Sequence, residues 1–359
     1  MADAPQQLSF PPGTELVFGP QAARRTRIES ELARVIHGWG FDDIILPGFD
    51  APETFESLGS DAGLYRLVDR EGHNLVLRAD FTQIASKALA MELRRGKRQI
   101  RATYEGRVYR FQPSGHGHRV EQSQRGLEWV NAQGPVFDAA CILIARECLH
   151  AVGIDNAVIV VGHAGFVNAV LGERGRTDRR LHEALDHKNP SRIAELAQRL
   201  GLDAESARLL ETLPLLTGGA EVLRQAAGFK LAAPARDALA DLEAIHELLA
   251  QCGVNDVLFD LGEVRQFHYY SGAMFKVYSS AVGDELGGGG RYDRLYDRFG
   301  LDVPAVGFGF NMARLTEAAP RDFGGQIQPT SIAANSAGAL AQALALRAQG
   351  KPLVVGGKP

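Results

Sequence analysis

The sequence predicts a fold of mixed helices and strands, in which a helical segment separates two strand-rich halves. In the first half, two stretches with strand character, 100–111 and 124–130, are joined by a polar loop and are expected to pair antiparallel. Between Gly172 and Cys252 the chain becomes rich in Ala, Leu, Arg and Glu, with apolar residues at helical spacing. In the second half, an alternating apolar run at 274–278 again predicts a strand with one buried face.

The elements of the first half follow from periodicity and from helix and turn signals. Apolar residues at helical spacing predict a helix over 19–39, and Pro47 stops the short apolar strand that follows it. Asp80 stands just before the first turn of another predicted helix, so its simplest interpretation is a capping carboxylate. The expected elements are helix 19–39, strand 44–46, a hairpin over 64–77 with its turn at 70–72, helix 82–95, helix 137–152 and strand 157–161.

The second half is read in the same way. Gly287–Gly290 alone favour a loose, glycine-rich hairpin loop, and no Lys-Ser/Thr follows them as a Walker loop requires. A Gly-x-Gly turn at Gly307 and Gly309 is expected to precede a last core helix. The expected elements are helices 179–187, 191–200, 204–213, 220–227 and 234–250, strand 256–261, helix 307–319, helix 337–347 and strand 353–355.

Composition excludes several classes of protein. The 359 residues are 45% hydrophobic and 23% charged, with a formal net charge of -4 and no basic tract, so nucleic acid is not an expected partner. No apolar run approaches the roughly 20 residues of a membrane span, and the N-terminus shows no secretory signal. The three cysteines lack zinc spacing and predict buried free thiols in a reducing cytoplasm, with no metal or cofactor.

Three separated segments carry arginines beside other polar groups. Arg110 lies at the end of one predicted strand, and Gln124 and Glu128 lie on the return strand. Because these two differ by four residues, both are expected on the same face of the sheet. The other groups are Arg265, Tyr269 and Tyr270 in RQFHYYSG, and Arg314 in AVGFGFNMARL.

These segments resemble the catalytic core of class II aminoacyl-tRNA synthetases, specifically the histidyl branch. The first helix, strand and Pro47 resemble motif 1, which forms dimers; YRFQ…RGLEW resembles motif 2 and AVGFGFNMARL motif 3. RQFHYYSG and GGGGRYDRL are similar to the two histidyl signatures. The resemblance covers roughly residues 8–320. It implies an α+β fold, an antiparallel sheet flanked by helices, in a 1–320 domain with a helical insertion at about 173–250 and a short α/β tail at 321–359.

The resemblance also implies a pocket for free histidine. Asp80 and Gln124 would bind the α-ammonium, Glu128 one imidazole nitrogen and Tyr270 the imidazole edge. Arg265 would lie over the α-carboxylate, with Arg110 close by. The implied set is Asp80, Thr82, Arg110, Gln124, Glu128, Arg265, Tyr269 and Tyr270. Such groups satisfy an ammonium, a carboxylate and an imidazole with charge-assisted bonds. Two simpler interpretations stay open: Tyr269 as a core residue, and Glu128 as partner of a neighbouring arginine.

Several positions depart from the synthetase pattern. Gln112 stands where motif 2 has Glu, which leaves Arg110, Gln112 and Arg314 as a vestigial ATP site. Gln266, Phe267 and His268 replace Gly-Leu-Asp, and His268 is interpreted first as a core residue, with a metal ligand or an altered site as alternatives. The 45 residues after Arg314 are too few for the anticodon-binding domain, which is therefore expected to be absent.

A histidyl-synthetase core with these departures is similar to the regulatory subunits of ATP phosphoribosyltransferase. That resemblance implies a non-catalytic chain that activates a short catalytic subunit in the first step of histidine biosynthesis. It implies feedback inhibition by bound histidine and a hetero-octamer with four subunits of each kind. The loop 113–123 and the glycines 287–290 are the candidate moving parts. The alternative is a truncated histidyl-tRNA synthetase-like enzyme that forms histidyl-adenylate.

Overall fold

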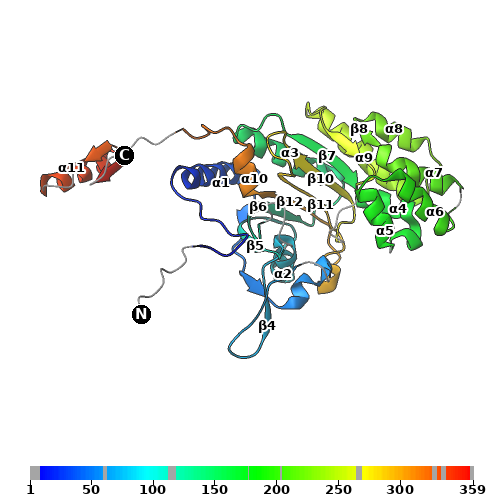
Figure 1. Ribbon diagram of the computed structural model, residues 1–359, viewed down its shortest axis with the longest axis horizontal. Helices are drawn as coiled ribbons and strands as arrows, with labels where there is room; N and C mark the ends of the chain where they lie inside the picture. Colours follow the sequence, from blue (N-terminus) through cyan, green and yellow to red (C-terminus); the bar gives the residue numbers. More distant parts are fainter. Residues whose placement is uncertain are drawn as a thin grey trace, which may run out of the picture.

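A nine-stranded sheet forms the centre of the computed structural model (Figure 1), which describes residues 9–59, 63–111, 119–176, 178–202, 204–263, 269–325, 330–332 and 337–355. The strand order is β1-β5-β6-β12-β11-β10-β7-β9-β8. The strands, in that order, are Asp42–Asp43, Ile100–Tyr109, Glu121–Val130, Ala305–Asn311, Gly287–Arg291, Ala273–Tyr278, Val158–His163, Leu258–Asp260 and Thr217–Gly218.

The predicted α+β class is confirmed, and the sheet is antiparallel through its centre. The strands from β5 to β7 pair antiparallel throughout. Two pairs nearer the edges, β1 with β5 and β7 with β9, are parallel. The antiparallel strands β5 to β7 therefore match the antiparallel sheet that the resemblance implied. The parallel pairs near the edges make the whole sheet mixed.

Helices cover both faces of this sheet. The larger hydrophobic core lies between one face and the helices α1 (Pro20–Gly38), α3 (Pro135–Ala151), α9 (Ala233–Gln251) and α10 (Met312–Ala318). Helix α2 (Phe81–Arg94) packs on the opposite face, where a second cluster includes the tyrosines Tyr104, Tyr292 and Tyr296. The two faces therefore differ in chemistry: one is sealed by apolar helices, and the other carries aromatic and polar groups.

The glycine run 287–290 is a central strand, so the prediction of a loose loop was wrong. Strand β11 pairs with β10 on one side and β12 on the other. A Cβ at Gly289 would lie 2.4 Å from the Cβ of Phe308, and one at Gly287 would lie 2.9 Å from a ring carbon of Phe310. Glycine is required there because these two phenylalanines pack against the strand backbone.

The Gly-x-Gly pair before the last core helix also lies in a strand and not in a turn. Gly307 and Gly309 belong to β12, and the helix begins only at Met312. Asn311 is the residue before α10, and its side-chain oxygen accepts hydrogen bonds from the backbone N–H groups of Ala313 and Arg314. An asparagine cap thus starts the helix five residues later than the predicted position.

The strand predicted at 44–46 is displaced. The pairing with β5 involves Asp42 and Asp43, and it ends with a hydrogen bond from Ile44 N–H to the Thr103 carbonyl. Ile45 is 97% exposed, whereas Leu46 belongs to the second hydrophobic cluster and Ile44 packs against it, so the apolar run is buried only in part. Apolarity alone misplaced the element, since the strand is set by pairing with a distant partner.

The predicted hairpin is confirmed as β3 (Arg66–Val68) and β4 (Asn74–Leu77). A third strand that the sequence did not indicate, β2 (Phe49–Asp50), pairs with the other side of β4. The 3-10 helix η1 (Pro52–Leu58) follows β2 and packs against α2. This small sheet extends below the main one in Figure 1.

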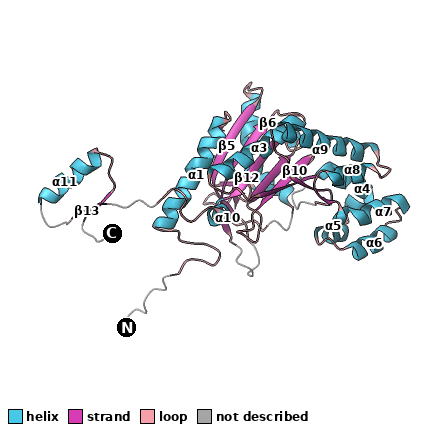
Figure 2. Cartoon of the chain, turned by 90° about the horizontal axis from the view of Figure 1, so that it is seen from above, coloured by secondary structure: helices cyan, strands magenta, loops and turns pink. Residues whose placement is uncertain are grey.

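The segment between the two halves is helical, as its composition predicts. It contains α4 (Ala164–Arg176), α5 (Arg179–Asp186), α6 (Pro190–Arg199), α7 (Ala204–Thr212), η2 (Leu213–Leu215) and α8 (Glu221–Ala227). Gly172 has φ 62 and kinks α4 where this segment begins. In both views these helices form one group at the side of the sheet away from α1 (Figures 1 and 2).

The last described residues form a small βαβ unit. Strands β13 (Thr330–Ile332) and β14 (Leu353–Val355) pair in parallel, and α11 (Ala337–Ala348) connects them. Its own apolar cluster centres on Ile332, Ala339 and Ala343. The domain division near residue 320 stays a prediction. The 3-10 helix η3 (Asp297–Phe299) completes the elements.

The cysteine prediction is confirmed for two of three residues. Cys141 and Cys148 are buried free thiols within the core, but Cys252 is exposed just after α9. No helix in the described ranges is long and apolar enough to cross a membrane.

Candidate functional site

A cavity of about 140 Å³ lies on the polar face of the sheet, where β6, β12 and β11 form its floor. This volume is below the few hundred cubic ångströms typical of sites for drug-sized ligands, so it suits a small metabolite. The lining residues are Asp80, Thr82, Tyr104, Arg110, Gln122, Gln124, Tyr269, Tyr270, Glu285, Gly287, Gly288, Tyr292, Gly307, Phe308, Gly309, Asn311 and Arg314.

A row of glycines makes room for this cavity. Gly126, Gly309 and Gly288 stand directly opposite one another on three neighbouring strands, so all three face the cavity side. The phenol of Tyr104, next in the same row, lies over them: its oxygen would be 2.5 Å from a Cβ at Gly126 and 3.2 Å from one at Gly309. Side chains at these positions would fill the floor.

Next to the buried end of the cavity lies Glu128, a carboxylate that is not itself a lining residue and that pairs with no cation among the described residues. Glu128 is 1% exposed, and one of its oxygens accepts a hydrogen bond from the Thr82 hydroxyl at 2.8 Å. Its other oxygen and the Tyr292 hydroxyl are buried without a hydrogen-bond partner among the described residues. Both atoms approach Gly307, since a Cβ there would lie 2.5 Å from the first and 2.7 Å from the second. Unsatisfied buried polar atoms are costly, so a ligand that bonds to them is favoured.

Burial controls the protonation of this end. Desolvation raises the pKa of Glu128 well above its ordinary value; the Thr82 hydrogen bond opposes this rise and the nearby Asp80 adds to it. Burial likewise raises the pKa of the Tyr104 phenol, with Glu128 the next cause. Burial at this end therefore disfavours the charged form of the carboxyl group relative to water.

Asp80 has two roles in the structure. One carboxylate oxygen accepts from the Gln83 backbone N–H at 2.9 Å and caps α2, as the simplest interpretation predicts. The other accepts from the Arg110 guanidinium at 3.1 Å, and Arg110 also donates to the Ala79 carbonyl at 2.6 Å. Burial raises the pKa of Asp80, and the charge of Arg110 opposes this shift. The pair lies across the cavity wall between β5 and the start of α2.

Tyrosines form the wall opposite α2. The rings of Tyr269 and Tyr270 are 4.8 Å apart between centroids, and Tyr269 meets Tyr292 edge-on at 6.0 Å. Tyr269 also packs against the second hydrophobic cluster, so it is both a core residue and a lining residue.

Arg291 anchors this wall from behind. Its guanidinium contacts Asp138 at 2.9 and 3.1 Å and donates to the carbonyls of Ala132 and Gly134 at 2.8 and 3.0 Å. It also reaches Asp293 at 3.1 Å. Tyr292, between these two residues, is thereby held in place beside the cavity. Burial raises the pKa of Asp138 to about 6, although Arg291 opposes the shift.

The exposed end of the cavity is lined by amides and by one further arginine. Gln124 and Asn311 are direct neighbours across β6 and β12. They stand four residues from Glu128 and Gly307, which is about 13 Å along the strands. The Asn311 side chain contacts Gln122 at 3.4 Å, and Arg314 donates to the Glu285 carbonyl at 3.0 Å.

The structure therefore brings together most of the residues expected from the sequence. Among the described residues Glu128 bonds to Thr82 and to no arginine, so the interpretation of Glu128 as the partner of a neighbouring arginine finds no support there. Gln112, Arg265 and His268 lie outside the described residues. The residues not anticipated are Tyr104, Gln122, Glu285, Tyr292 and Asn311. Gln122 was detectable, because it lies two residues from Gln124 on the same strand face.

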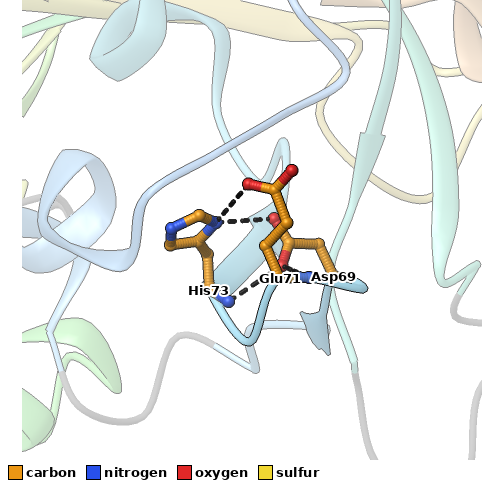
Figure 3. Close-up of side chains that lie close together, drawn as sticks. All are labelled: Asp69, Glu71 and His73. Atoms are coloured by element: carbon orange, nitrogen blue, oxygen red, sulfur yellow. Dashed lines mark hydrogen bonds and ion pairs between the residues drawn. The ribbon is translucent and has the colours of Figure 1, made fainter.

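A second cluster lies at the hairpin turn and has a structural explanation (Figure 3). One oxygen of Asp69 accepts from the backbone N–H groups of Glu71 and His73, each at 2.8 Å, and the other lies 2.8 Å from His73 Nδ1. The carboxylate of Glu71 is 3.8 Å from the same nitrogen. These side chains are grouped because Asp69 closes the turn, which is a common role for aspartate.

The fold and the site define a class II synthetase-like protein of the histidyl type. Residues 13–315 match the family described as Histidyl-tRNA synthetase. A solved histidyl-tRNA synthetase from Nostoc superposes with a TM-score of 0.78 over 99% of this chain and 87% of its own, at 18% identity, which supports the fold.

Closer relatives carry a different description. The ATP phosphoribosyltransferase regulatory subunit of Moorella thermoacetica is 31% identical, over 98% of this chain and 92% of the relative. That of Geobacter metallireducens is 32% identical, over 88% and 74% respectively. A crystal structure from Bacillus halodurans, described as an ATP phosphoribosyltransferase regulatory subunit/histidyl-tRNA synthetase, has 29% identity and a TM-score of 0.87, over 98% of this chain and 93% of that one. The chain belongs to the family of ATP phosphoribosyltransferase regulatory subunits.

Proposed function

We propose that this chain is a non-catalytic regulatory subunit of ATP phosphoribosyltransferase that senses free histidine. It activates a short catalytic subunit, which joins ATP to phosphoribosyl pyrophosphate in the first step of histidine biosynthesis, and it carries feedback inhibition by histidine. The family relationship supports the regulatory role. The choice of ligand depends on the cavity.

One observation carries the histidine assignment. Tyr292 lines the buried end of the cavity, and an oxygen of Glu128 lies close to the Tyr292 hydroxyl beside Gly307; neither atom has a hydrogen-bond partner in the described part of the chain. An imidazole with one N–H group and one acceptor nitrogen matches this pair, because the carboxylate accepts from the first and the phenol donates to the second. A ring stacked beside Tyr270 would fill the aromatic wall. The Glu128 oxygen and the Tyr292 hydroxyl therefore fit the imidazole of histidine. An aliphatic side chain would leave both of these groups without a hydrogen bond.

The amino-acid end of histidine has its own partners. Asp80 and Gln124 line the cavity and supply acceptors for the α-ammonium, and the Arg110 guanidinium lies beside Asp80 for the carboxylate. We assign Arg265 to the same carboxylate from its position in the RQFHYYSG signature. Thr82 holds Glu128 in orientation.

Regulation then follows from linkage between the cavity and the catalytic subunit. Histidine must bind one arrangement of the complex more tightly than the other, with a coupling of typically about 1–3 kcal/mol. The loop 113–123 is the proposed moving part; residues 113–118 lie outside the described residues, and 121–123 belong to β6. Gly287–Gly290 are withdrawn from that role, because a strand paired on both sides has no freedom to move separately. A change in hydrogen-exchange protection of the loop on histidine binding is the expected sign.

The proposed assembly has two levels. Motif 1, which comprises α1 and the short β1, forms the homodimer, and the dimers join catalytic subunits in a hetero-octamer with four of each. Analytical ultracentrifugation of the mixed subunits tests this stoichiometry, and a stable one-to-one complex would contradict it.

The central experiment uses the purified chain with a short catalytic subunit. Phosphoribosyl transfer is measured with and without the chain, and then with added histidine. We expect the chain to raise turnover and histidine to abolish the increase. Histidine-dependent ATP–pyrophosphate exchange by the chain alone is the second measurement. Exchange at a synthetase-like rate, together with no effect on transfer, would instead identify an enzyme that forms histidyl-adenylate.

A further inference from the structure

The exposed end of the cavity contains an ion pair that histidine binding does not require. Arg314 lies in the first turn of α10, and its backbone N–H is fixed by the Asn311 cap at 3.2 Å. Its guanidinium contacts the carboxylate of Asp284 and donates to the neighbouring Glu285 carbonyl at 3.0 Å. Asp284 comes from the turn between β10 and β11, so the turn and the helix meet through this pair.

Three cations on this side of the sheet are paired with carboxylates. Among the described residues that line the cavity, the two cations are Arg110 and Arg314, and each has an aspartate partner. Lys276 stands directly opposite Gly288 on β10, so it shares the cavity face, and its ammonium is 2.6 Å from Glu263. Each of these three described cations is therefore matched by a carboxylate of the same chain.

Phosphate groups need the opposite arrangement. Guanidinium groups bind phosphates through two parallel hydrogen bonds, and this fork must be available. At Arg314 the fork is occupied by a carboxylate carried on the same chain, and such a tethered group acts at an effective concentration in the millimolar range. A phosphorylated ligand would have to displace it. Glu128 lies about 13 Å along the strands from the Gln124–Asn311 pair that precedes α10, so a ligand side chain bound at Glu128 would leave the Arg314–Asp284 pair in place.

We propose that Asp284 determines the specificity of this cavity: by pairing with Arg314 it excludes phosphorylated ligands and reserves the cavity for a small zwitterion. This goes beyond histidine sensing, because it concerns the ligands that the cavity refuses. It also explains how a cavity with the arginines of a nucleotide site remains selective in a complex whose catalytic subunit uses two phosphorylated substrates.

The exposure of the pair makes the proposal testable. The side chains of Arg314 and Asp284 are 29% and 53% exposed, so the pair contributes little to stability and its removal leaves the fold intact. Asp284→Asn removes the charge and keeps the shape. Glu317→Gln is the matched control. Glu317 is exposed on the same helix, and its substitution removes one negative charge without changing the Arg314–Asp284 pair.

The experiment titrates the wild-type chain, D284N and E317Q with inorganic pyrophosphate by calorimetry at low ionic strength. We expect D284N to bind pyrophosphate roughly fivefold or more tightly than wild type. The reason is that the Arg314 guanidinium no longer has to exchange an exposed carboxylate partner for the phosphate group. E317Q should match wild type, and Asp284→Ser should repeat the gain. Equal affinities for wild type and D284N would overturn the proposal, and so would an equal gain in E317Q, which would indicate a general charge effect.

Titration of the same three proteins with histidine separates this proposal from the proposed function. Histidine affinity should agree within about twofold among them, because neither Asp284 nor Glu317 is assigned a contact with histidine and exposed charges are screened. If none of the proteins bound histidine, the sensing function would fail while the pyrophosphate comparison still decided the role of Asp284.

Discussion

Two arginine–aspartate pairs flank the same cavity, and they differ in burial. Arg291 and Asp138 lie behind the tyrosine wall with side chains 9% and 7% exposed, and Arg291 also bonds to two backbone carbonyls. Arg314 and Asp284 lie at the cavity mouth and are 29% and 53% exposed. An arginine–aspartate ion pair therefore stabilises the fold at Arg291, whereas at Arg314 it is a surface contact that another anion can replace.

The difference is physical. A buried arginine that loses its partner, or an acid that loses its arginine, is left as an uncompensated charge in a medium of low dielectric constant. At the surface, water replaces the lost partner at little cost. Burial, rather than the identity of the two residues, determines which pair maintains the fold and which is available to regulate ligand choice.

The largest effect is expected from Arg291→Met. This change leaves Asp138 buried without its cation and removes the donors to Ala132 and Gly134, so unfolding should become easier by about 4 kcal/mol. Arg314→Met is the matched variant and should cost less than about 1 kcal/mol. Urea unfolding of both proteins measures the difference, and similar losses in the two would break the comparison.

The next effect concerns the floor at the buried end. In Gly307→Ala, the new methyl group would lie 2.4 Å from the Leu127 carbonyl oxygen and 2.5 Å from Glu128. We expect a destabilisation of about 3 kcal/mol and a loss of ligand binding, because the centre of a sheet cannot shift without strain. Gly283→Ala, at the turn near the exposed end, has no atom within 4 Å of the added methyl and should leave both properties unchanged. A stable G307A protein that binds normally would refute this geometry.

Glu128→Gln tests the chemistry of the buried end. Because the carboxylate is proposed to accept a charge-assisted bond from the imidazole, its loss should weaken histidine binding by about 2 kcal/mol, or roughly thirtyfold. Calorimetry measures the affinity. Glu121→Gln on the same strand is the control, since Glu121 is the first residue of β6 and pairs with the exposed side chain of Arg107. Equal losses in the two variants would argue against a specific role for Glu128.

The same variant has a smaller, opposite effect on stability. Burial raises the pKa of Glu128 in the folded chain above its ordinary value of 4.5. The folded state therefore retains the proton more strongly, so this contribution to stability is present below pH 4.5 and is lost as pH rises toward the folded pKa. E128Q should flatten this part of the stability profile and unfold at a slightly higher temperature at pH 7. An unchanged slope between pH 4.5 and 7 would show that Glu128 is not desolvated.

Much of the local structure was predictable because it depends on neighbours along the chain. The helix at 20–38 follows from apolar residues repeated at helical spacing, and the hairpin at 66–77 follows from a turn with Gly72 at its corner. Asp80 as a helix cap is equally local. The prediction failed where the local pattern was ambiguous. The glycines of β11 favoured a loop, because a strand made of glycines shows no alternation of apolar and polar side chains.

The sequence alone determined the family and the chemical inventory of this protein, since the arginine, tyrosine and glycine signatures keep their order and spacing whatever the conformation. Only the tertiary structure decided how those groups are used. Asp80 turned out to be shared between a helix cap and Arg110, and Glu128 to be bonded to Thr82 with one oxygen left unsatisfied. Arg314 turned out to be closed by an aspartate thirty residues earlier. The physical reason is that the burial and the ion pairing of a side chain depend on contacts between distant segments. Burial and pairing determine the energy of a charged group, whereas the sequence shows only that the group is present.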